Sequence, residues 1–163
     1  MADLEFSVAE AGDWPGIWEI FRRVVATGDT YPYRPDTSEE EAKAIWMAPS
    51  HTVLVASSQD EVVGTAYYRP NMAGLGDHVA NAGWMIRPDR QGEGIGRRFA
   101  GYVLEHAREA GFLGMQFNAV VATNTGAIAL WESLGFETVG TVPDAFRHPV
   151  HDLTPVHIMY RRL

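Results

Sequence analysis

The sequence predicts a mixed α/β fold: one domain over residues 1–163, with a central sheet of about seven strands and helices on both faces. Strand-like and helix-like segments alternate along the chain without a linker, an internal repeat or a low-complexity run. The length of 163 residues suits one hydrophobic core of ordinary domain size. The composition, 46% hydrophobic and 21% charged residues, is typical of a globular protein.

The first half of the chain contains four predicted strands and two predicted helices. Residues 4–8 alternate like a half-buried strand. An apolar face with helical spacing begins at Trp14, and the pattern Ser38–Glu41 is a capping box that opens a second helix. The remaining strands of this half are predicted at 52–56, 62–68 and 78–86.

The second half contains two predicted helices and three predicted strands. A long helix begins at Ile95, and Gly111 is suited to end it. Asn124 is a candidate N-cap for a shorter helix, which Gly135 ends. Residues 143–152, which include two prolines and two aspartates, are predicted to form a loop. The strands of this half are predicted at 115–121, 136–142 and 156–160.

The composition argues against several classes of function. The chain has no cysteine, which excludes disulfides, thiolate metal sites and a cysteine nucleophile, and we expect no metal. A formal charge of −8 argues against nucleic acid or an anionic membrane as a partner. No apolar run reaches membrane-spanning length, and the N-terminus lacks the pattern of a secretory signal. We therefore expect a cytoplasmic protein that binds neither nucleic acid nor membrane.

The stretch from Pro88 to Arg98 carries the clearest chemical signal. It lies between a predicted strand and a predicted helix, and glycines alternate at 92, 94 and 96. At a helix start the first backbone N–H groups lack helical acceptors, and the helix dipole is positive there. Residues 87–98 also hold four arginines against two acidic residues. Together these features predict a site for a phosphate or a pyrophosphate.

The spacing within this stretch distinguishes between phosphate ligands. A dinucleotide-binding fingerprint requires a third glycine where this chain has Arg97, and a Walker loop requires Gly-Lys-Ser/Thr, which the chain lacks. Gln91-x-x-Gly94-x-Gly96 instead resembles the Gln/Arg-x-x-Gly-x-Gly/Ala pattern of the GNAT N-acetyltransferases. Residues 124–136 resemble a second segment of that family, Asn-x-x-Ala…Leu-Tyr-Glu-x-Leu-Gly-Phe. The predicted order of strands and helices follows the GNAT order along essentially the whole chain.

The resemblance implies a GNAT fold, with a sheet splayed between its fourth and fifth strands, and acetyl-CoA as co-substrate. In the family, the end of the central strand binds the pantetheine arm through its backbone, and the glycine-rich loop binds the pyrophosphate. An Asn at a helix N-cap also stabilises the helix by itself, so Asn124 has a structural explanation as well. The acetyl-CoA contacts that the resemblance implies are Met85, Ile86, Gln91, Gly92, Glu93, Gly94, Ile95, Gly96, Arg97, Asn124 and Trp131.

Two positions depart from the family pattern. Trp131 replaces the Tyr that often protonates the leaving thiolate, and an indole cannot act as an acid. Asn81 stands where many members have a Glu as general base. Without a carboxylate base, an α-amino group with a pKa of about 7.7–8 is more easily acetylated than a lysine side chain with a pKa of about 10.4. We therefore expect an α-amine or another weakly basic nitrogen as the acceptor.

Asn81 and Asn118 are candidate catalytic residues, expected on neighbouring strands where the acetyl group meets its acceptor. Amide groups there can bind a substrate carboxylate, orient an amine or polarise a thioester. The structural alternative is that each satisfies backbone groups where the strands separate. With Asn124, Trp131 and residues 140–146, they resemble the proline-analogue (azetidine-2-carboxylate) N-acetyltransferases, in which the first two asparagines are expected to hold a small amino-acid-like substrate.

The expected acceptor contacts come from two loops and are Tyr31, Tyr33, Arg34 and Phe146. The predicted function is direct transfer of an acetyl group from acetyl-CoA to the amine of a small molecule, an amino acid or an amino-acid analogue. Two alternatives stay open: acetylation of protein or peptide N-termini, and a non-catalytic acyl-CoA-binding module. The expected partner is a small-molecule amine, and a homodimer built through the C-terminal strands also stays open.

Overall fold

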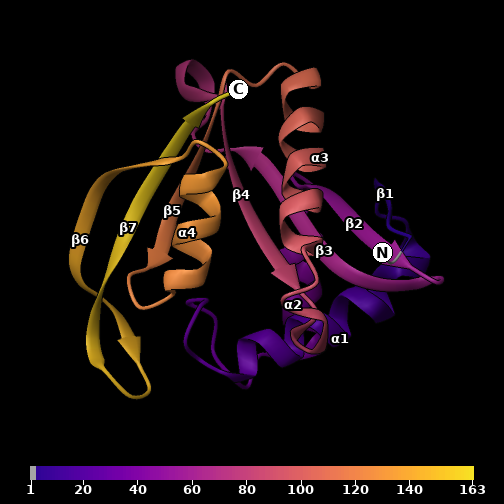
Figure 1. The fold of residues 1–163 in the computed structure, drawn as a ribbon, viewed down its shortest axis with the longest axis horizontal. Coiled ribbons are helices and arrows are strands. Elements are labelled where there is room, and N and C mark those ends of the chain that lie inside the picture. Colours follow the sequence, from indigo (N-terminus) through magenta and orange to yellow (C-terminus); the bar gives the residue numbers. More distant parts are fainter. Residues whose placement is uncertain (1–2) are drawn as a thin grey trace.

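The computed structural model describes residues 3–163, which form one seven-stranded sheet covered by helices on both faces (Figure 1). The strand order is β1-β2-β3-β4-β5-β7-β6, with β4 and β5 parallel and all other neighbours antiparallel. The predicted fold class is confirmed. In chain order the elements are β1 (Glu5–Val8), α1 (Trp14–Ala26), α2 (Glu39–Trp46), β2 (Thr52–Ser58), β3 (Glu61–Pro70), β4 (Val79–Ile86), α3 (Ile95–Glu109), β5 (Gly114–Val121), α4 (Thr125–Ser133), β6 (Glu137–His148) and β7 (Asp152–Arg162).

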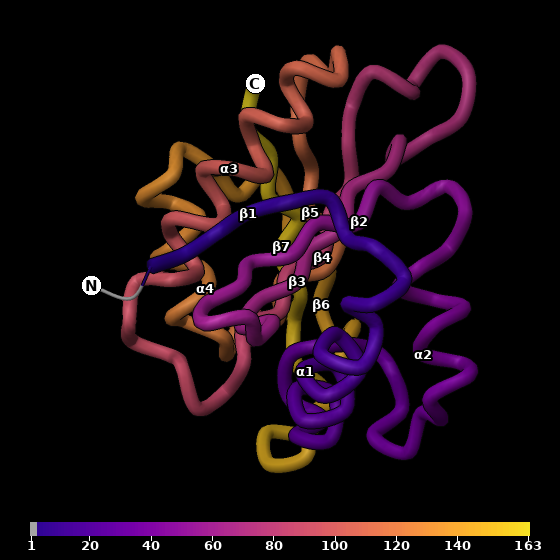
Figure 2. The backbone as a smooth tube through the Cα atoms, turned by 90° about the vertical axis from the view of Figure 1, so that its right-hand side faces the viewer, coloured from indigo at the N-terminus to yellow at the C-terminus, as the bar shows by residue number. Residues whose placement is uncertain are grey.

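The sheet separates two hydrophobic cores. Helices α1 and α2 cover one face, and α3 and α4 cover the other (Figure 2). Alternate residues of β4 point into different cores, as strand geometry requires: Ala80 lies in the core beneath α3, and Met85 lies in the core beneath α1 and α2. Within residues 3–163, no helix is long and apolar enough to cross a membrane.

Strands β4 and β5 separate after a short pairing. Their register covers three positions: Val79 with Gly114, Ala80 with Met115, and Asn81 with Gln116. Beyond these positions β5 pairs only with β7, and Figure 1 shows β4 and β5 diverging. At its C-terminal end, β4 therefore has a neighbouring strand, β3, on one side only. The candidate functional site lies on the other side.

The C-terminal hairpin is longer than predicted. Most of residues 143–152 belong to β6 or β7, so the predicted loop was wrong. Pro143 is tolerated because β6 is an edge strand, where a missing N–H costs no ladder hydrogen bond. An irregularity in register between Val142 and Phe146 accommodates Asp144, which has a φ of 54°.

The predicted caps at the starts of α2 and α4 are both present. The Ser38 hydroxyl accepts from the Glu41 N–H at 3.2 Å, and the Glu41 carboxylate accepts from the Ser38 N–H at 2.9 Å, which confirms the capping box of α2. At the start of α4, the Asn124 side chain accepts from the Ala127 N–H at 3.3 Å, which confirms that cap as well.

Candidate functional site

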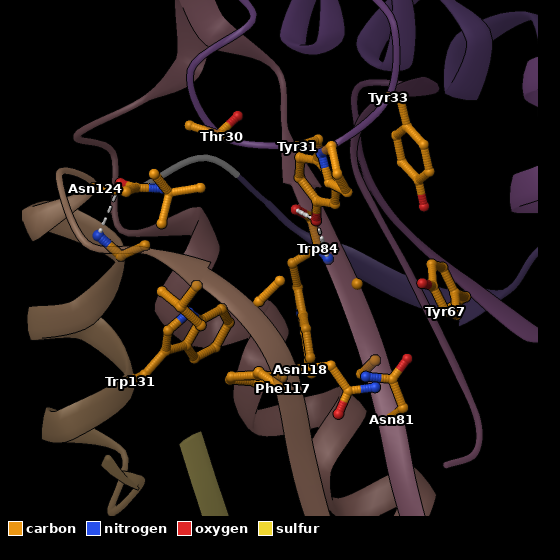
Figure 3. Close-up of a pocket in the computed structure, with 17 residues that line it drawn as sticks. Thr30, Tyr31, Tyr33, Tyr67, Asn81, Trp84, Phe117, Asn118, Asn124 and Trp131 are labelled. Carbon is orange, nitrogen blue, oxygen red and sulfur yellow. Dashed lines mark hydrogen bonds between the residues drawn. The ribbon is translucent and has the colours of Figure 1, made fainter. Parts of the chain in front are cut away.

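Two cavities meet where β4 and β5 separate. The larger, with a volume of about 810 Å³, runs along the end of β4 and the start of α3, and we call it the groove. The smaller, about 190 Å³, lies between β4, β5 and residues 30–33, and we call it the chamber (Figure 3). Six residues line both cavities and form the neck between them: Thr30, Tyr31, Trp84, Asn124, Ala127 and Trp131.

The groove extends to the N-terminus of α3. Gly94 caps this helix with a φ of 76°, and Gly92 has a φ of 85°, a left-handed conformation that glycine adopts at little cost. A Cβ on either residue would meet no atom within 4 Å, so the loop presents bare backbone to the groove. The first N–H groups of α3 have no helical acceptors, and the helix end is therefore suited to an anion.

The arginines around this loop differ in their pairing. Arg87 forms ion pairs with Asp89 and Glu61, and Arg90 forms one with Glu93, at 2.7–2.9 Å. Arg97, in contrast, donates to the hydroxyl of Ser133 at 2.7 Å and forms no ion pair among residues 3–163. The positive charge indicated by the sequence is therefore partly neutralised, and Arg97 is the guanidinium in the groove best placed to meet a phosphate.

Backbone groups along β4 face opposite sides in turn. The N–H of Arg87 donates to Val63 at 2.9 Å, and the carbonyl of Val79 accepts from Asn71 at 2.8 Å, so the odd-numbered positions direct their backbone toward β3. The backbone N–H and C=O groups of the even-numbered positions must therefore point to the opposite side, where β5 no longer pairs with β4. Strand geometry therefore decides which backbone groups are open to a ligand.

This alternation corrects one expectation. Met85 lines the groove, but it is opposite Thr65, so its backbone faces β3 and is not open to a pantetheine arm. Trp84 and Ile86 have their N–H and C=O groups on the open side of β4. Any backbone pairing by an arm in the groove would therefore use Trp84 and Ile86.

The hydroxyl of Tyr31 occupies part of that open side. It accepts from the Trp84 N–H at 2.8 Å and donates to the Trp84 carbonyl at 2.5 Å (Figure 3). Burial raises the pKa of the Tyr31 phenol well above its usual range, so the hydroxyl stays protonated and can make both bonds. Beside it, the hydroxyl of Thr30 and the indole N–H of Trp84 are buried without a hydrogen-bond partner in the described part of the chain, residues 3–163.

The chamber is lined by aromatic and other uncharged side chains. Among the residues that line it there is no Asp, Glu, His, Lys or Arg. Burial also raises the pKa of the Tyr33 phenol, so Tyr31 and Tyr33 are neutral near pH 7. The chamber therefore offers hydrogen bonds and aromatic faces, and it lacks a carboxylate or imidazole base. The aromatic side chains that line it are Tyr31, Tyr33, Tyr67, Trp84, Phe117 and Trp131.

Asn81 and Asn118 both line the chamber, as Figure 3 shows. The Asn81 amide donates to the carbonyl of Gln116 at 3.0 Å, across the last paired position of β4 and β5. The Asn118 amide donates to Asn71 at 2.8 Å and its carbonyl oxygen accepts from Gln116 at 3.0 Å. Each asparagine thus has a structural bond where the strands separate, and each also faces the space where an acceptor would lie.

Asn124 and Trp131 belong to the neck. The side-chain oxygen of Asn124 is used in the helix cap. The Trp131 indole is 8% exposed and packs against Phe117, at 4.7 Å between ring centroids, and against Trp84, at 5.0 Å. Trp131 therefore forms an apolar wall of the neck, in a place where the family pattern has a hydroxyl.

Three predicted site residues lie outside both cavities. Glu93 pairs with Arg90 and does not line the groove. Arg34 pairs with Asp36 at 2.9 Å, and its side chain is 83% exposed. Phe146 is buried in a small cluster with Val121 and Val156. The other predicted acetyl-CoA contacts line the groove, and Tyr31 and Tyr33 line the chamber.

Sequence reasoning did not find several residues of the site. Tyr67 and Phe117 line the chamber. Asp29 lines the groove, where it accepts from the Thr27 hydroxyl at 2.5 Å. Side chains along β3 alternate between the two faces of the sheet. This alternation could have indicated Tyr67, because side chains on the same face of neighbouring strands lie next to one another.

Comparison with known proteins decides the family. The sequence profile described as Acetyltransferase (GNAT) family matches residues 14–136. The chain belongs to the GNAT acetyltransferase family. A solved GCN5-related N-acetyltransferase from Kribbella flavida superposes on this GNAT protein with a TM-score of 0.92 and 44% sequence identity, over 98% of each chain.

Curated relatives agree with this assignment. The GNAT protein is 31% identical over 144 residues to the N-acetyltransferase aca1 of Schizosaccharomyces pombe, which covers 78% of this chain and 69% of the relative. It is 32% identical over 150 residues to the L-methionine sulfoximine/L-methionine sulfone acetyltransferase of Pseudomonas aeruginosa. The match covers 84% of this chain and 83% of the relative. The protein is thus an acetyl-CoA-dependent N-acetyltransferase. The narrower resemblance to proline-analogue acetyltransferases stays a prediction.

Proposed function

We propose that this enzyme transfers the acetyl group of acetyl-CoA directly to the amine of a free amino acid or amino-acid analogue. The observation that carries the proposal is the chamber, which opens onto the neck and lies below the roughly 300–1,000 Å³ of most ligand pockets. A volume of about 190 Å³ suits a compact acceptor rather than a protein segment.

The groove supplies a fitting site for acetyl-CoA. Bare backbone at the α3 N-terminus, together with Arg97, suits the pyrophosphate, and the open side of β4 at Trp84 and Ile86 suits the amides of the arm. The bound donor supplies a thioester carbonyl that an amine can attack. The new C–N bond forms as the C–S bond breaks and CoA leaves as a thiolate. The amine loses a proton to solvent and the thiolate takes one up, so the products are the amide and the free thiol.

The residues that line the chamber favour an acceptor amine with a low pKa. An amine must be neutral to attack, and no carboxylate or imidazole lines the chamber to remove its proton. An α-amino group, with a pKa of about 7.7–8, reaches the neutral form at a smaller cost than a lysine side chain does. The relative from Pseudomonas aeruginosa is named for two methionine derivatives of this kind.

Arg69 is the cation that we assign to the acceptor carboxylate. It lies directly opposite Asn81 in the register of β3 and β4, so the two side chains share one face of the sheet. Burial raises the pKa of the Tyr33 phenol and the charge of Arg69 opposes that rise, an interaction that supports this assignment. Within residues 3–163, Arg69 forms no ion pair.

Asn81 and Asn118 are proposed to orient the acceptor. Their amides lie at the end of the chamber where β4 and β5 separate. From there they can bond to a carboxylate or an amine without supplying a base.

The experiment that tests this function is thiol release from acetyl-CoA across free amino acids, methionine sulfone and sulfoximine, proline analogues, polyamines and N-terminal peptides. We expect turnover of a small amino acid or analogue. The Arg69→Gln variant should raise KM about 10- to 100-fold for acceptors with a carboxylate, as expected for the loss of a charged hydrogen bond. Asn81→Ala and Asn118→Ala should lower kcat while acetyl-CoA still binds.

Arg22→Gln is the matched control for Arg69, because Arg22 pairs with Glu19 on the exposed side of α1 and should not affect KM. Preferred turnover of peptides over free amino acids would contradict the proposal and favour N-terminal acetylation. Tight binding of acetyl-CoA without thiol release on any acceptor would favour an acyl-CoA-binding module.

We also propose a homodimer through the C-terminal hairpin. β6 is an edge strand of twelve residues, and apolar side chains are exposed on the hairpin: Val139, Val142, Val150 and Leu153. Exposed apolar side chains gathered on one surface are typical of association sites.

A further inference from the structure

Tyr31 makes a pair of hydrogen bonds that a neighbouring strand would normally make. Its hydroxyl both accepts from the N–H and donates to the C=O of Trp84. In a sheet, a residue of the adjacent strand satisfies these two groups. β5 has left β4 by this point, since their last paired position is Asn81 with Gln116. The phenol hydroxyl therefore stands in for a strand.

The same position is the one that an acyl donor needs. Trp84 and Tyr31 line both the groove and the chamber, so Trp84 lies where an arm running along β4 reaches the acceptor. An amide or thioester carbonyl cannot bond to the Trp84 N–H while Tyr31 holds it, because a backbone N–H makes one strong hydrogen bond. Binding of the arm and the Tyr31 bridge therefore compete.

The segment that carries Tyr31 also forms the chamber. Tyr31 and Tyr33 stack, with 5.6 Å between ring centroids and 11° between ring planes, and both line the chamber with Thr30. A shift of Tyr31 must therefore move the wall that faces the acceptor.

The bridged arrangement carries a local cost. The Thr30 hydroxyl and the Trp84 indole N–H are buried there without hydrogen-bond partners among residues 3–163. Each unpartnered buried donor is unfavourable, and such groups in a native structure call for an explanation. Two of them beside the Tyr31 bridge indicate an arrangement that a ligand can relieve.

We propose that Tyr31 is a positioning residue that yields the Trp84 backbone to the acyl donor and, as it moves, sets the wall of the chamber for the acceptor. The inference rests on the proposed binding of acetyl-CoA along β4. It adds that the loop of residues 27–38 connects the two cavities, so that donor binding prepares acceptor binding.

The test compares donor affinity in wild type and Tyr31→Phe by calorimetry, with no acceptor present. Phe keeps the ring and its stacking but removes the competing hydroxyl, so acetyl-CoA should bind about 3- to 10-fold more tightly, as expected for the release of hydrogen bonds. The nucleotide part of CoA, 3′-phospho-ADP, lacks the arm and should bind equally to both proteins. Tyr102→Phe, on α3 and away from both cavities, should leave both affinities unchanged.

Equal acetyl-CoA affinity in wild type and Tyr31→Phe would overturn the inference, as would an equal gain for 3′-phospho-ADP. Failure of wild type to bind acetyl-CoA at all would instead remove the proposed function. Hydrogen exchange on wild type gives an independent measurement if the variant does not fold. Acetyl-CoA should slow exchange at residues 82–90 and speed it at residues 27–38, and unchanged exchange at 27–38 would also overturn the inference.

Discussion

Gly94 and Gly101 show how one residue type serves two purposes in the α3 region. Gly94 is the N-cap, and its φ of 76° lies in the left-handed region, where a Cβ is strained. Gly101 lies inside the helix with open space around its Cα. The first glycine is required by backbone conformation, and the second only lowers helix stability.

The two positions therefore respond oppositely to the same change. Gly94→Ala should lower the free energy of unfolding by about 1–2 kcal/mol because of left-handed strain, and it should weaken acetyl-CoA binding. Gly101→Ala should raise the free energy of unfolding by about 0.5–1 kcal/mol, because alanine favours a helix interior. Urea unfolding and calorimetry measure both effects. A stabilising Gly94→Ala would contradict the assigned conformation.

At the scale of elements, the sequence predicts what local patterns determine. The capping box of α2, the Asn124 cap and the glycine loop depend on a few neighbouring residues, and the structure contains each of them. Predictions that depended on distant packing were less accurate. Arg34 was an acceptor candidate, but a neighbouring carboxylate holds it at the surface.

The loop predicted within the C-terminal hairpin was wrong for a related reason. Its prolines and aspartates are breakers by local propensity, but an edge strand with a bulge tolerates them. The sequence also could not indicate that Trp84 lines both the groove and the chamber, because this position depends on where β5 separates from β4. Register and strand separation are tertiary properties, and single residues do not report them.

The segment between β4 and α3 is tied to α1 by Asp89. The Arg87 guanidinium lowers the pKa of Asp89 to about 2, and Arg23 of α1 bonds to it at 2.9 Å. A carboxylate with a lowered folded-state pKa stabilises the fold above its unfolded pKa of about 3.9, and this stabilisation is lost as pH falls through about 2.

We expect Asp89→Asn to unfold at a lower temperature than wild type at pH 7, with the difference maintained to about pH 4 and disappearing near pH 2. Circular dichroism melts over this pH range measure it. Asp77→Asn is the control, because Asp77 forms no ion pair in the part of the chain that the structure describes. A difference that is the same at pH 2 and pH 7 would show that the ion pairs do not cause it.

At the scale of the whole molecule, the helices cover both faces of the sheet, and its two edge strands differ in length. β1 forms one edge and is short, with four residues. β6 forms the other edge, is three times as long and is largely exposed. Long exposed edges are sites where a second chain can add, so the two ends of the sheet differ in their capacity to associate.

Sedimentation should therefore find a particle of twice the 18.0 kDa of one chain. Val139→Lys, at a side chain that is 60% exposed on β6, should shift the equilibrium toward monomer. Leu75→Lys changes an equally apolar but fully exposed residue between β3 and β4 and should have no effect on mass. A monomer at all concentrations of wild type would contradict the dimer.

The open side of β4 has a consequence for mutation. Its N–H and C=O groups at Trp84 and Ile86 belong to the main chain, so nearly every substitution at these positions keeps them. Only proline removes the N–H. The side chains around the chamber, in contrast, change with every amino-acid substitution at those positions. Substitutions around the chamber can therefore alter acceptor recognition while Trp84 and Ile86 keep the backbone groups that face the donor.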